Sequence, residues 1–317
     1  MKLLRRLDEV SAGTVATIGN FDGVHRGHQA LLAQLHRQAD KMKLPVTVFL
    51  FEPQPGEYFH GQLAPARLTS LREKLQILKQ CNVDYVYCLK FNKHLALMPA
   101  PDFAQHYFFS LHHVKYLLIG RDFRFGHARQ GDVALLEELG QRTGCLVQTF
   151  PDFAIAEERV SSTKIRNALL QGQLEQATVL LGRTFSLCGR VVKGDGRGKQ
   201  WGIPTANLGM HRLTLPLKGV FCVQVRRSTG ELLKGVANIG SRPTVDGTKN
   251  ILEIHLFDFN ESLYGEMLQV FFLHKLRDEI KFSSVDALIQ QIQDDVVAAK
   301  EQFKGALAFR QFELFDF

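Results

Sequence analysis

The stretch that decides the fold is Gly19-Asn20-Phe21-Asp22-Gly23-Val24-His25-Arg26-Gly27-His28. It follows an apolar, strand-like run at residues 14–18 and leads into a helical pattern that carries Leu31, Leu32 and Leu35. Its glycines and histidines therefore occupy a strand-to-helix turn, where backbone N–H groups favour phosphate and glycine permits its close approach. Each histidine there can add a donor or a positive charge during phosphoryl or nucleotidyl transfer. The alternative is a glycine-rich turn with two exposed histidines.

Length and composition favour a two-domain protein that handles small anions. The chain has 317 residues and a net charge of +7, but no basic low-complexity run that would indicate nucleic acid. Its five cysteines include no CxxC pair, which predicts reduced thiols in a cytoplasmic protein. No apolar segment follows the basic start or reaches membrane-spanning length, so no membrane partner is expected. No histidine has zinc-ligand spacing with cysteine or a carboxylate.

The first half alternates strands with helices, which predicts a doubly wound parallel α/β sheet. The expected strands are residues 14–18, 46–51, 83–89, 114–119 and 146–150. Helices are expected from the capping box at Ser70, near Pro101, and from Asp132 to a stop at Gly140. Ligands in such sheets bind beyond the carboxyl ends of the strands. Four polar segments should therefore share one edge: residues 19–28, 52–55, 120–126 and 160–166.

The second half changes to short β-rich runs with glycine-rich turns, which predicts a small β-barrel or sandwich. A final helix is expected from Ser283 or Ser284, with an apolar stripe at Val285, Leu288, Ile289, Ile292, Val296 and Phe303. Before the barrel lies a helix pair at residues 164–170 and 174–181. The predicted domains are residues 1–182 and 183–317.

Two segments of the first domain are candidates for substrate contacts. Ser162, Thr163 and Arg166 could form a helix N-terminus that binds an anion, or an ordinary capped helix start. Asp122 and Phe125 lie in a loop that interleaves arginines with aromatic rings, which suits phosphate pairing and ring stacking. The alternative for these rings is a solvated loop with buried phenylalanines.

The second domain offers a basic glycine loop and a run of hard ligands. Gly196, Gly198 and Lys199 belong to that loop, which is either a phosphate-binding loop or an ordinary turn. Thr205 and Asn207 are two residues apart, so they point the same way on an extended chain and suit magnesium. A threonine and asparagine turn after Pro204 is the other possibility.

The opening stretch resembles the HxGH nucleotidyltransferases, and its full form resembles the bacterial bifunctional riboflavin kinase/FAD synthetase family. Residues 161–166 are similar to that family's SSTxIR motif, and residues 120–126 to its G-x-D/N-F-x-F-G motif. The resemblance implies a first domain that adenylylates FMN with ATP, releasing pyrophosphate. The residues it implies around the reacting phosphates and substrates are Gly19, Asn20, Phe21, Asp22, Gly23, His25, His28, Asp122, Phe125, Ser162, Thr163 and Arg166.

The second half resembles riboflavin kinases in its GRG loop and in the run Gly202-Ile203-Pro204-Thr205-Ala206-Asn207-Leu208. The resemblance implies ATP-dependent phosphorylation of riboflavin, with Mg²⁺ on Thr205 and Asn207 and with Glu253 as the base. Trp201 departs from the leucine usual in that family. From the residues alone, Glu253 alternates with Leu252 and Ile254 on a strand, so either a solvated face or a base in a partly buried site explains it.

We therefore expect a flavin-cofactor enzyme whose partners are ATP, riboflavin and FMN, with neither nucleic acid nor membrane. One alternative is an HxGH transferase with another acceptor, such as phosphopantetheine or nicotinamide mononucleotide, which leaves the second half unexplained. A basic RNA-binding protein is the non-enzyme alternative, but the phenylalanine-rich strands lack a clear alternation with Lys and Arg. The sequence does not set the oligomeric state.

Overall fold

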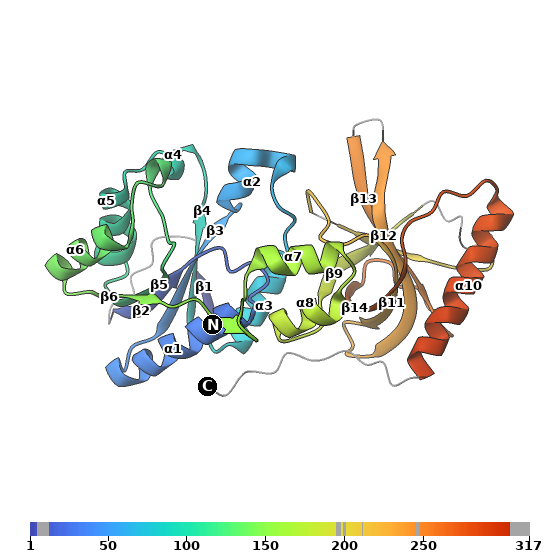
Figure 1. The fold of residues 1–317 in the computed structure, drawn as a ribbon, viewed down its shortest axis with the longest axis horizontal. Helices are drawn as coiled ribbons and strands as arrows, with labels where there is room; N and C mark the ends of the chain where they lie inside the picture. The colour runs from blue at the N-terminus through green and yellow to red at the C-terminus, as the bar shows by residue number, and fades with distance from the viewer. Residues whose placement is uncertain (5–12, 195–197, 199–200, 211, 245–246, 305–317) are drawn as a thin grey trace. The chain divides into compact units, whose positions relative to one another are not determined.

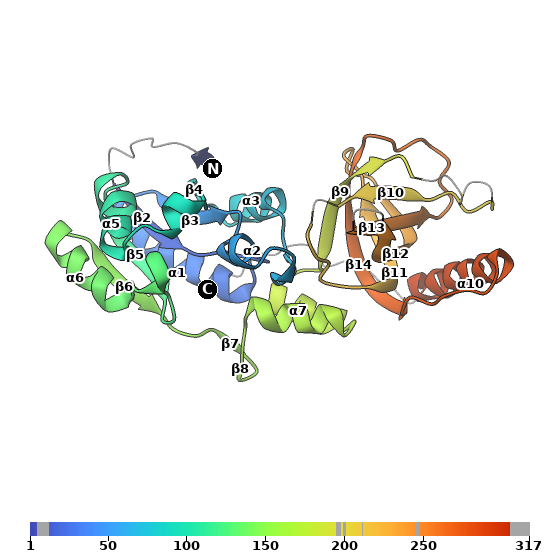
Figure 2. The same ribbon diagram turned by 90° about the horizontal axis from the view of Figure 1, so that it is seen from above.

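The computed structural model describes residues 1–4, 13–194, 198, 201–210, 212–244 and 247–304. They form two compact units (Figures 1 and 2). Of the described residues, the first unit contains those within 1–65 and 69–161, and the second contains residues 66–68 and those within 162–304.

The first unit is built on a six-stranded sheet of order β1-β4-β3-β2-β5-β6, in which every neighbouring pair is parallel. Its strands are β1 (Lys2–Leu4), β2 (Thr14–Ile18), β3 (Val46–Glu52), β4 (Tyr85–Lys90), β5 (Val114–Gly120) and β6 (Leu146–Phe150). Its helices are α1 (Arg26–Met42), α2 (Pro55–His60), η1 (Gly61–Leu63), α3 (Leu71–Gln80), α4 (Lys93–Ala96), α5 (Ala100–Phe103), the π-helix η2 (Ala104–Ser110), η3 (His127–Arg129) and α6 (Val133–Thr143). The predicted doubly wound α/β class is confirmed.

The strands of this sheet consist largely of apolar residues, as expected for a parallel sheet, because other elements bury its faces. All five residues of β2 are buried, and β3 contributes the fully buried Phe49. Phe108 of η2 packs edge-on against Phe49, with ring centroids 5.3 Å apart. The carboxyl ends of β2, β3 and β5 therefore meet at one edge of a packed sheet, where their loops are held by a rigid scaffold.

One helix end differs from the prediction. The helix expected to stop at Gly140 continues to Thr143 and ends at Gly144, whose φ of 71° is left-handed. Gly140 is instead a point of close approach, since a Cβ there would lie 2.6 Å from the Cys145 carbonyl oxygen. Gly140 therefore permits close packing inside the helix, and Gly144 is the glycine that ends it.

The second unit is a closed barrel of order β10-β13-β12-β11-β14-β9 with helices at both ends of its sequence, which confirms the predicted small β-barrel and final helix. Its strands are β9 (Ser186–Val192), β10 (Ala206–Gly209), β11 (Gly219–Arg226), β12 (Leu232–Thr244), β13 (Gly247–Leu256) and β14 (Met267–Arg277). Helices α7 (Ser162–Leu170) and α8 (Leu174–Leu181) precede the barrel. Helix α10 (Val285–Lys304) lies along the barrel wall (Figure 2).

Helix α10 begins where the sequence predicts, because the Ala287 N–H donates to Ser284 Oγ at 3.1 Å. Val296 and Phe303 pack on a barrel cluster that includes Val220. Val285 is 52% exposed, so the predicted stripe is wrong at its first position. Val285, in the first turn of α10, therefore lies outside the apolar contact between this helix and the barrel.

The helices α7 and α8 group with the barrel, although the predicted boundary at residues 182/183 follows them. Gly172, between these helices, is so close to β14 that a Cβ would lie 2.4 Å from Lys275 Cδ. Gly182 ends α8 with a φ of 75°. The boundary between functional domains remains a prediction. Among the described residues, no helix has the length and apolar character needed to span a membrane.

Candidate active sites

The turn after β2 brings the two histidines together. His25 is the N-cap of α1, and its Nδ1 accepts the His28 backbone N–H at 3.3 Å. The two imidazole rings stack with centroids 3.7 Å apart and planes 14° apart. The Phe21 ring also packs against His28, with ring centroids 4.6 Å apart. Two imidazoles therefore sit together at the positive end of a helix dipole.

Burial sets the protonation state of His28. Its pKa lies well below 6.5, first because burial disfavours the charged ring and then because electrostatic interactions with His25 and Lys74 oppose its protonation. His28 is therefore neutral at physiological pH. It can offer a hydrogen-bond donor to a phosphate but contributes no full positive charge. Of the two roles expected for this histidine, the structure favours the donor.

The backbone of this turn is held in an uncommon conformation. Phe21 and Val24 have φ of 46° and 39°, in the left-handed region that L side chains rarely adopt, and both are buried. Such residues persist where their surroundings fix them, and they cluster at active sites. The surroundings here include Thr69, whose N–H and Oγ1 donate to Asp22 Oδ1 at 3.0 and 3.2 Å. The Gly23 N–H donates in turn to Thr69 Oγ1 at 2.9 Å.

These contacts separate the predicted residues of the turn into two groups. Asp22 is only 2% exposed and its carboxylate is bonded to Thr69, so it acts in shaping the turn. Asn20 is exposed and Gly19 is half-buried, and the Gly19 N–H donates to the Phe49 carbonyl at 3.1 Å. Thr69 was missed because a lone threonine just before a helix cap carries no signal beyond capping.

The loop after β5 differs in part from the prediction. Phe125 is 5% exposed and belongs to the apolar core, so it is no open stacking surface. Phe123, stacked on it with centroids 5.6 Å apart, is the more accessible ring. Asp122 is exposed and forms an ion pair with Arg159 at 3.0 Å. Arg159 belongs to a small hairpin, β7 (Ala154–Ile155) and β8 (Glu158–Arg159), that the sequence did not indicate.

The predicted SSTxIR residues lie on α7 of the second unit. Ser162 is the first residue of that helix, Thr163 is exposed, and the Arg166 Nε donates to the Ala66 carbonyl at 2.6 Å. The hydroxyls therefore stand at a helix N-terminus, where anions are favoured. The structure assigns Arg166 a structural hydrogen bond, and its predicted catalytic role stays a prediction.

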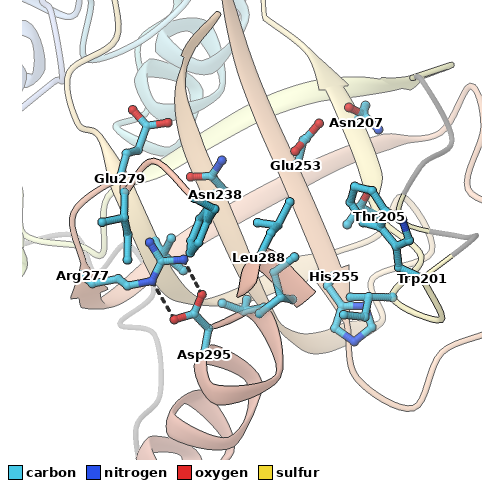
Figure 3. Close-up of a pocket in the computed structure, with 17 residues that line it drawn as sticks. Trp201, Thr205, Asn207, Asn238, Glu253, His255, Arg277, Glu279, Leu288 and Asp295 are labelled. Carbon is cyan, nitrogen blue, oxygen red and sulfur yellow. Dashed lines mark hydrogen bonds and ion pairs between the residues drawn. The ribbon is translucent and has the colours of Figure 1, made fainter. Parts of the chain in front are cut away.

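A cavity of about 250 Å³, here called the barrel cavity, lies between the outer face of the barrel wall and helix α10 (Figure 3). Its polar core is a row of side chains from three adjacent strands. Glu253 of β13 is opposite Asn207 of β10 on one side and Asn238 of β12 on the other. Its neighbours Leu252 and Ile254 are buried on the other face of the strand. The alternation expected around Glu253 is therefore present, and it directs the carboxylate into the cavity.

Thr205 and Asn207 also line this cavity, with a glycine-containing segment against them. A Cβ on Gly194 would lie 2.4 Å from Asn207 Nδ2, and one on Gly198 would lie 3.3 Å from Thr205 Oγ1. The backbone therefore lies close to both side chains, and Gly198 is required because a Cβ there would also lie 2.5 Å from the Ile203 carbonyl oxygen. Gly196 and Lys199, predicted in the same loop, are outside the described residues.

The far wall of the cavity is fixed by an ion pair that the sequence analysis missed. Arg277, at the end of β14, donates to both carboxylate oxygens of Asp295 on α10, at 2.8 and 2.7 Å. Asp295 is 5% exposed and also accepts from Gln291 at 3.2 Å. A signal was available, since Asp295 lies three residues after Ile292 on the apolar face of the helix. A carboxylate on that face needs a buried partner.

A second cavity, of about 430 Å³, adjoins the first through a shared residue, because Thr205 lines both. Its lining is largely apolar and aromatic and includes Pro204, Phe259, Leu263 and Tyr264. Glu253 lines the first cavity and its neighbour Ile254 lines the second, so the two cavities lie on opposite faces of β13, with Thr205 in the lining of both.

A strand-to-helix turn with two stacked histidines on a doubly wound sheet, together with a barrel that presents a carboxylate beside hard oxygen ligands, suits a transferase. The comparisons agree with this class. A family model for FAD synthetase matches residues 7–164, and one for riboflavin kinase matches residues 181–303. The chain belongs to the family of bifunctional riboflavin kinase/FMN adenylyltransferases.

Similar proteins cover nearly the whole chain. The bifunctional riboflavin kinase/FMN adenylyltransferase of Haemophilus influenzae is 46% identical over 308 residues, which is 96% of this chain and 100% of that protein. That of Escherichia coli K12 is 46% identical over 307 residues, 96% of this chain and 98% of that protein. A solved structure described as a macrolide-efflux protein from Streptococcus pneumoniae superimposes with a TM-score of 0.78 at 31% identity. It covers 93% of this chain and 96% of its own.

Proposed function

We propose that the chain makes both flavin cofactors. Riboflavin kinase activity lies in the barrel, and FMN adenylyltransferase activity lies in the first unit, called the sheet unit below. The observation that carries the kinase assignment is the Asn207–Glu253–Asn238 row inside the barrel cavity. The stacked His25–His28 pair at the start of α1 supports the adenylyltransferase.

In the kinase, Glu253 accepts the proton of the terminal riboflavin hydroxyl as that oxygen attacks the γ-phosphorus of ATP. The new O–P bond forms as the bond to the ADP leaving group breaks, and the proton ends on the carboxylate. A positioned general base of this kind typically contributes about 10²–10⁴-fold in rate. The remaining acceleration comes from holding the two substrates in line.

Magnesium is the metal we propose for this site. The described residues contain no group of three His, Cys, Asp or Glu side chains that could hold a metal, so a softer metal with such ligands is not indicated there. The Thr205 hydroxyl and the Asn207 amide oxygen are neutral hard donors, and Mg²⁺ typically takes few protein ligands and completes its shell with water and phosphate. When bound, the ion would neutralise charge on the ATP phosphates.

The two cavities suggest where the substrates bind. The polar row and the α10 wall surround the first cavity, so the riboflavin hydroxyl must reach it. The second cavity offers Pro204, Phe259 and Tyr264 to a flat base, which suits the adenine of ATP. Thr205 lies in both, so the ATP phosphates would pass it on the way to Glu253.

In the sheet unit, a phosphate oxygen of FMN attacks the α-phosphorus of ATP and pyrophosphate leaves. The FMN phosphate is largely ionised near neutral pH, so this step needs no general base. Neutral His28 donates a hydrogen bond to the reacting phosphates, and the N-terminus of α1 adds its partial positive charge. We assign Ser162, Thr163 and Arg166 to the ATP triphosphate, as the SSTxIR resemblance implies.

The rival assignments explain less. A nucleotidyltransferase for phosphopantetheine or nicotinamide mononucleotide would leave the polar row of the barrel without a use. We propose only small-molecule partners, and a cytoplasmic location is supported by five cysteines of the described chain, none of which forms a disulfide. Product analysis with riboflavin, ATP and magnesium tests the assignment, because only the flavin enzyme yields FMN and then FAD.

A further inference from the structure

Lys74 is an unusual buried cation next to the adenylyltransferase site. It lies on α3 and is completely buried, with an exposed fraction of 0%. Lysine is almost never fully buried unless it is paired or serves a purpose. Its Nζ donates to the backbone carbonyl of Asn20, at the start of the turn that leads to His25 and His28.

Its place on the helix makes this burial more costly. The capping box fixes the start of α3, since the Ser70 N–H donates to Glu73 Oε2 at 2.6 Å and the Glu73 N–H donates to Ser70 Oγ at 3.3 Å. Lys74 follows immediately and so lies in the first turns of the helix, where the dipole disfavours a cation. Helix stability alone gives no reason for a lysine at this position.

The segment from Thr69 to Lys74 holds the strained turn from one side. Thr69 donates a hydrogen bond to Asp22 and accepts one from Gly23, and Lys74 donates one to the Asn20 carbonyl. The left-handed Phe21 lies between these anchored residues, so the segment supports the conformation that such a φ requires. Lys74 is also close enough to act electrostatically on His28, as His25 does.

We propose that Lys74 is a positioning residue for adenylyl transfer: it fixes the turn of His25 and His28 through the Asn20 carbonyl and adds a buried positive charge beneath the phosphate site. This inference rests on the proposed adenylyltransferase function of the sheet unit. The lysine reaches the turn from a separate element, so the imidazole donors are aligned before ATP binds. Preorganised charge of this kind acts most strongly where water is excluded.

The test compares full-length wild type, Lys74→Met, Lys74→Arg and the control Lys79→Met, an exposed position on the same helix. Conversion of supplied FMN to FAD is measured as kcat and KM, and riboflavin phosphorylation by the barrel reports the integrity of the chain. We expect K74M to lower kcat for FAD synthesis by about 10- to 100-fold, since small misplacements of a reacting group cost up to this much. K74R should recover most of that loss, while K79M and all kinase activities stay at wild-type values.

A second readout does not depend on activity. In K74M the loss of one positive charge should raise the pKa of His28 toward 6.5, measured by NMR of the labelled imidazole, whereas K79M should leave it unchanged. Lys74→Gln replaces K74M if the latter does not fold by circular dichroism. The proposal would be overturned by a wild-type rate of FAD synthesis in K74M, by a K74R variant whose rate is as low as that of K74M, or by an unchanged His28 pKa in K74M. A wild-type protein that makes no FAD would instead refute the adenylyltransferase assignment, and the His28 titration would still decide the role of Lys74.

Discussion

Replacing Glu253 by glutamine removes the proposed base of the kinase and little else. Glutamine keeps the shape of the side chain, so the row with Asn207 and Asn238 can persist. A positioned base contributes about 10²–10⁴-fold in rate. That corresponds to roughly 2.7–5.4 kcal/mol of transition-state stabilisation at 1.36 kcal/mol per tenfold. We therefore expect kcat for FMN formation to fall by about this factor, with the KM of ATP nearly unchanged.

The assay supplies riboflavin, ATP and magnesium, and separates riboflavin from FMN by chromatography. Conversion of supplied FMN to FAD serves as the internal control, because Glu253 lies in the barrel and that reaction is assigned to the other unit. Glu301→Gln is the matched variant, since Glu301 is an exposed residue of α10 that forms an ion pair with exposed Lys304. Kinase turnover in Glu253→Gln within threefold of that of Glu301→Gln would refute the reasoning and make Glu253 a structural residue.

Four further outcomes follow from the structure. His28→Ala should lower FAD synthesis by about 10²–10³-fold and leave riboflavin phosphorylation intact, since one preorganised donor is lost; equal loss of both activities would indicate misfolding. Because the pKa of His28 is depressed in the fold, the unfolded chain binds its proton first as the pH falls below about 6.5, so thermal denaturation should show wild type losing stability there and His28→Asn losing less. Asp295→Asn should raise the KM of riboflavin and speed hydrogen exchange in α10, because it breaks the bidentate ion pair with Arg277. An unchanged KM would show that α10 does not contribute to riboflavin binding. A fragment of residues 183–317 should phosphorylate riboflavin but melt below a fragment of residues 162–317, since it lacks α7 and α8; a folded but inactive 183–317 fragment would contradict the predicted domain boundary.

The sequence was most informative where local pattern decides structure. Apolar runs bounded by turn residues predicted five of the six parallel strands, all except β1, and the stretch from Gly19 to His28 predicted a strand, a turn and a helix that are all present. The alternation around Glu253 predicted its direction correctly, because side chains on a strand alternate between faces whatever its neighbours are.

What the sequence did not show depends on partners distant along the chain. Asn207 and Asn238 flank Glu253 only through the pairing of three strands, which no local pattern contains. Lys74 looks like an ordinary helix-surface lysine until the fold buries it against Asn20. Gly140 was misread because a glycine gives the same local signal whether it ends a helix or permits a close contact. Phe125 was placed in the site because an aromatic residue in a loop does not reveal its burial.

The most direct test of the central claim is a time course with the purified full-length chain, riboflavin, ATP and magnesium. Our account predicts that FMN appears first and that FAD and pyrophosphate follow, with one ATP consumed for each step. When FMN replaces riboflavin, FAD should be the only flavin product. ATP turnover without FMN, or FMN that is never converted to FAD under these conditions, would contradict the assignment of the two sites to successive steps of flavin cofactor synthesis.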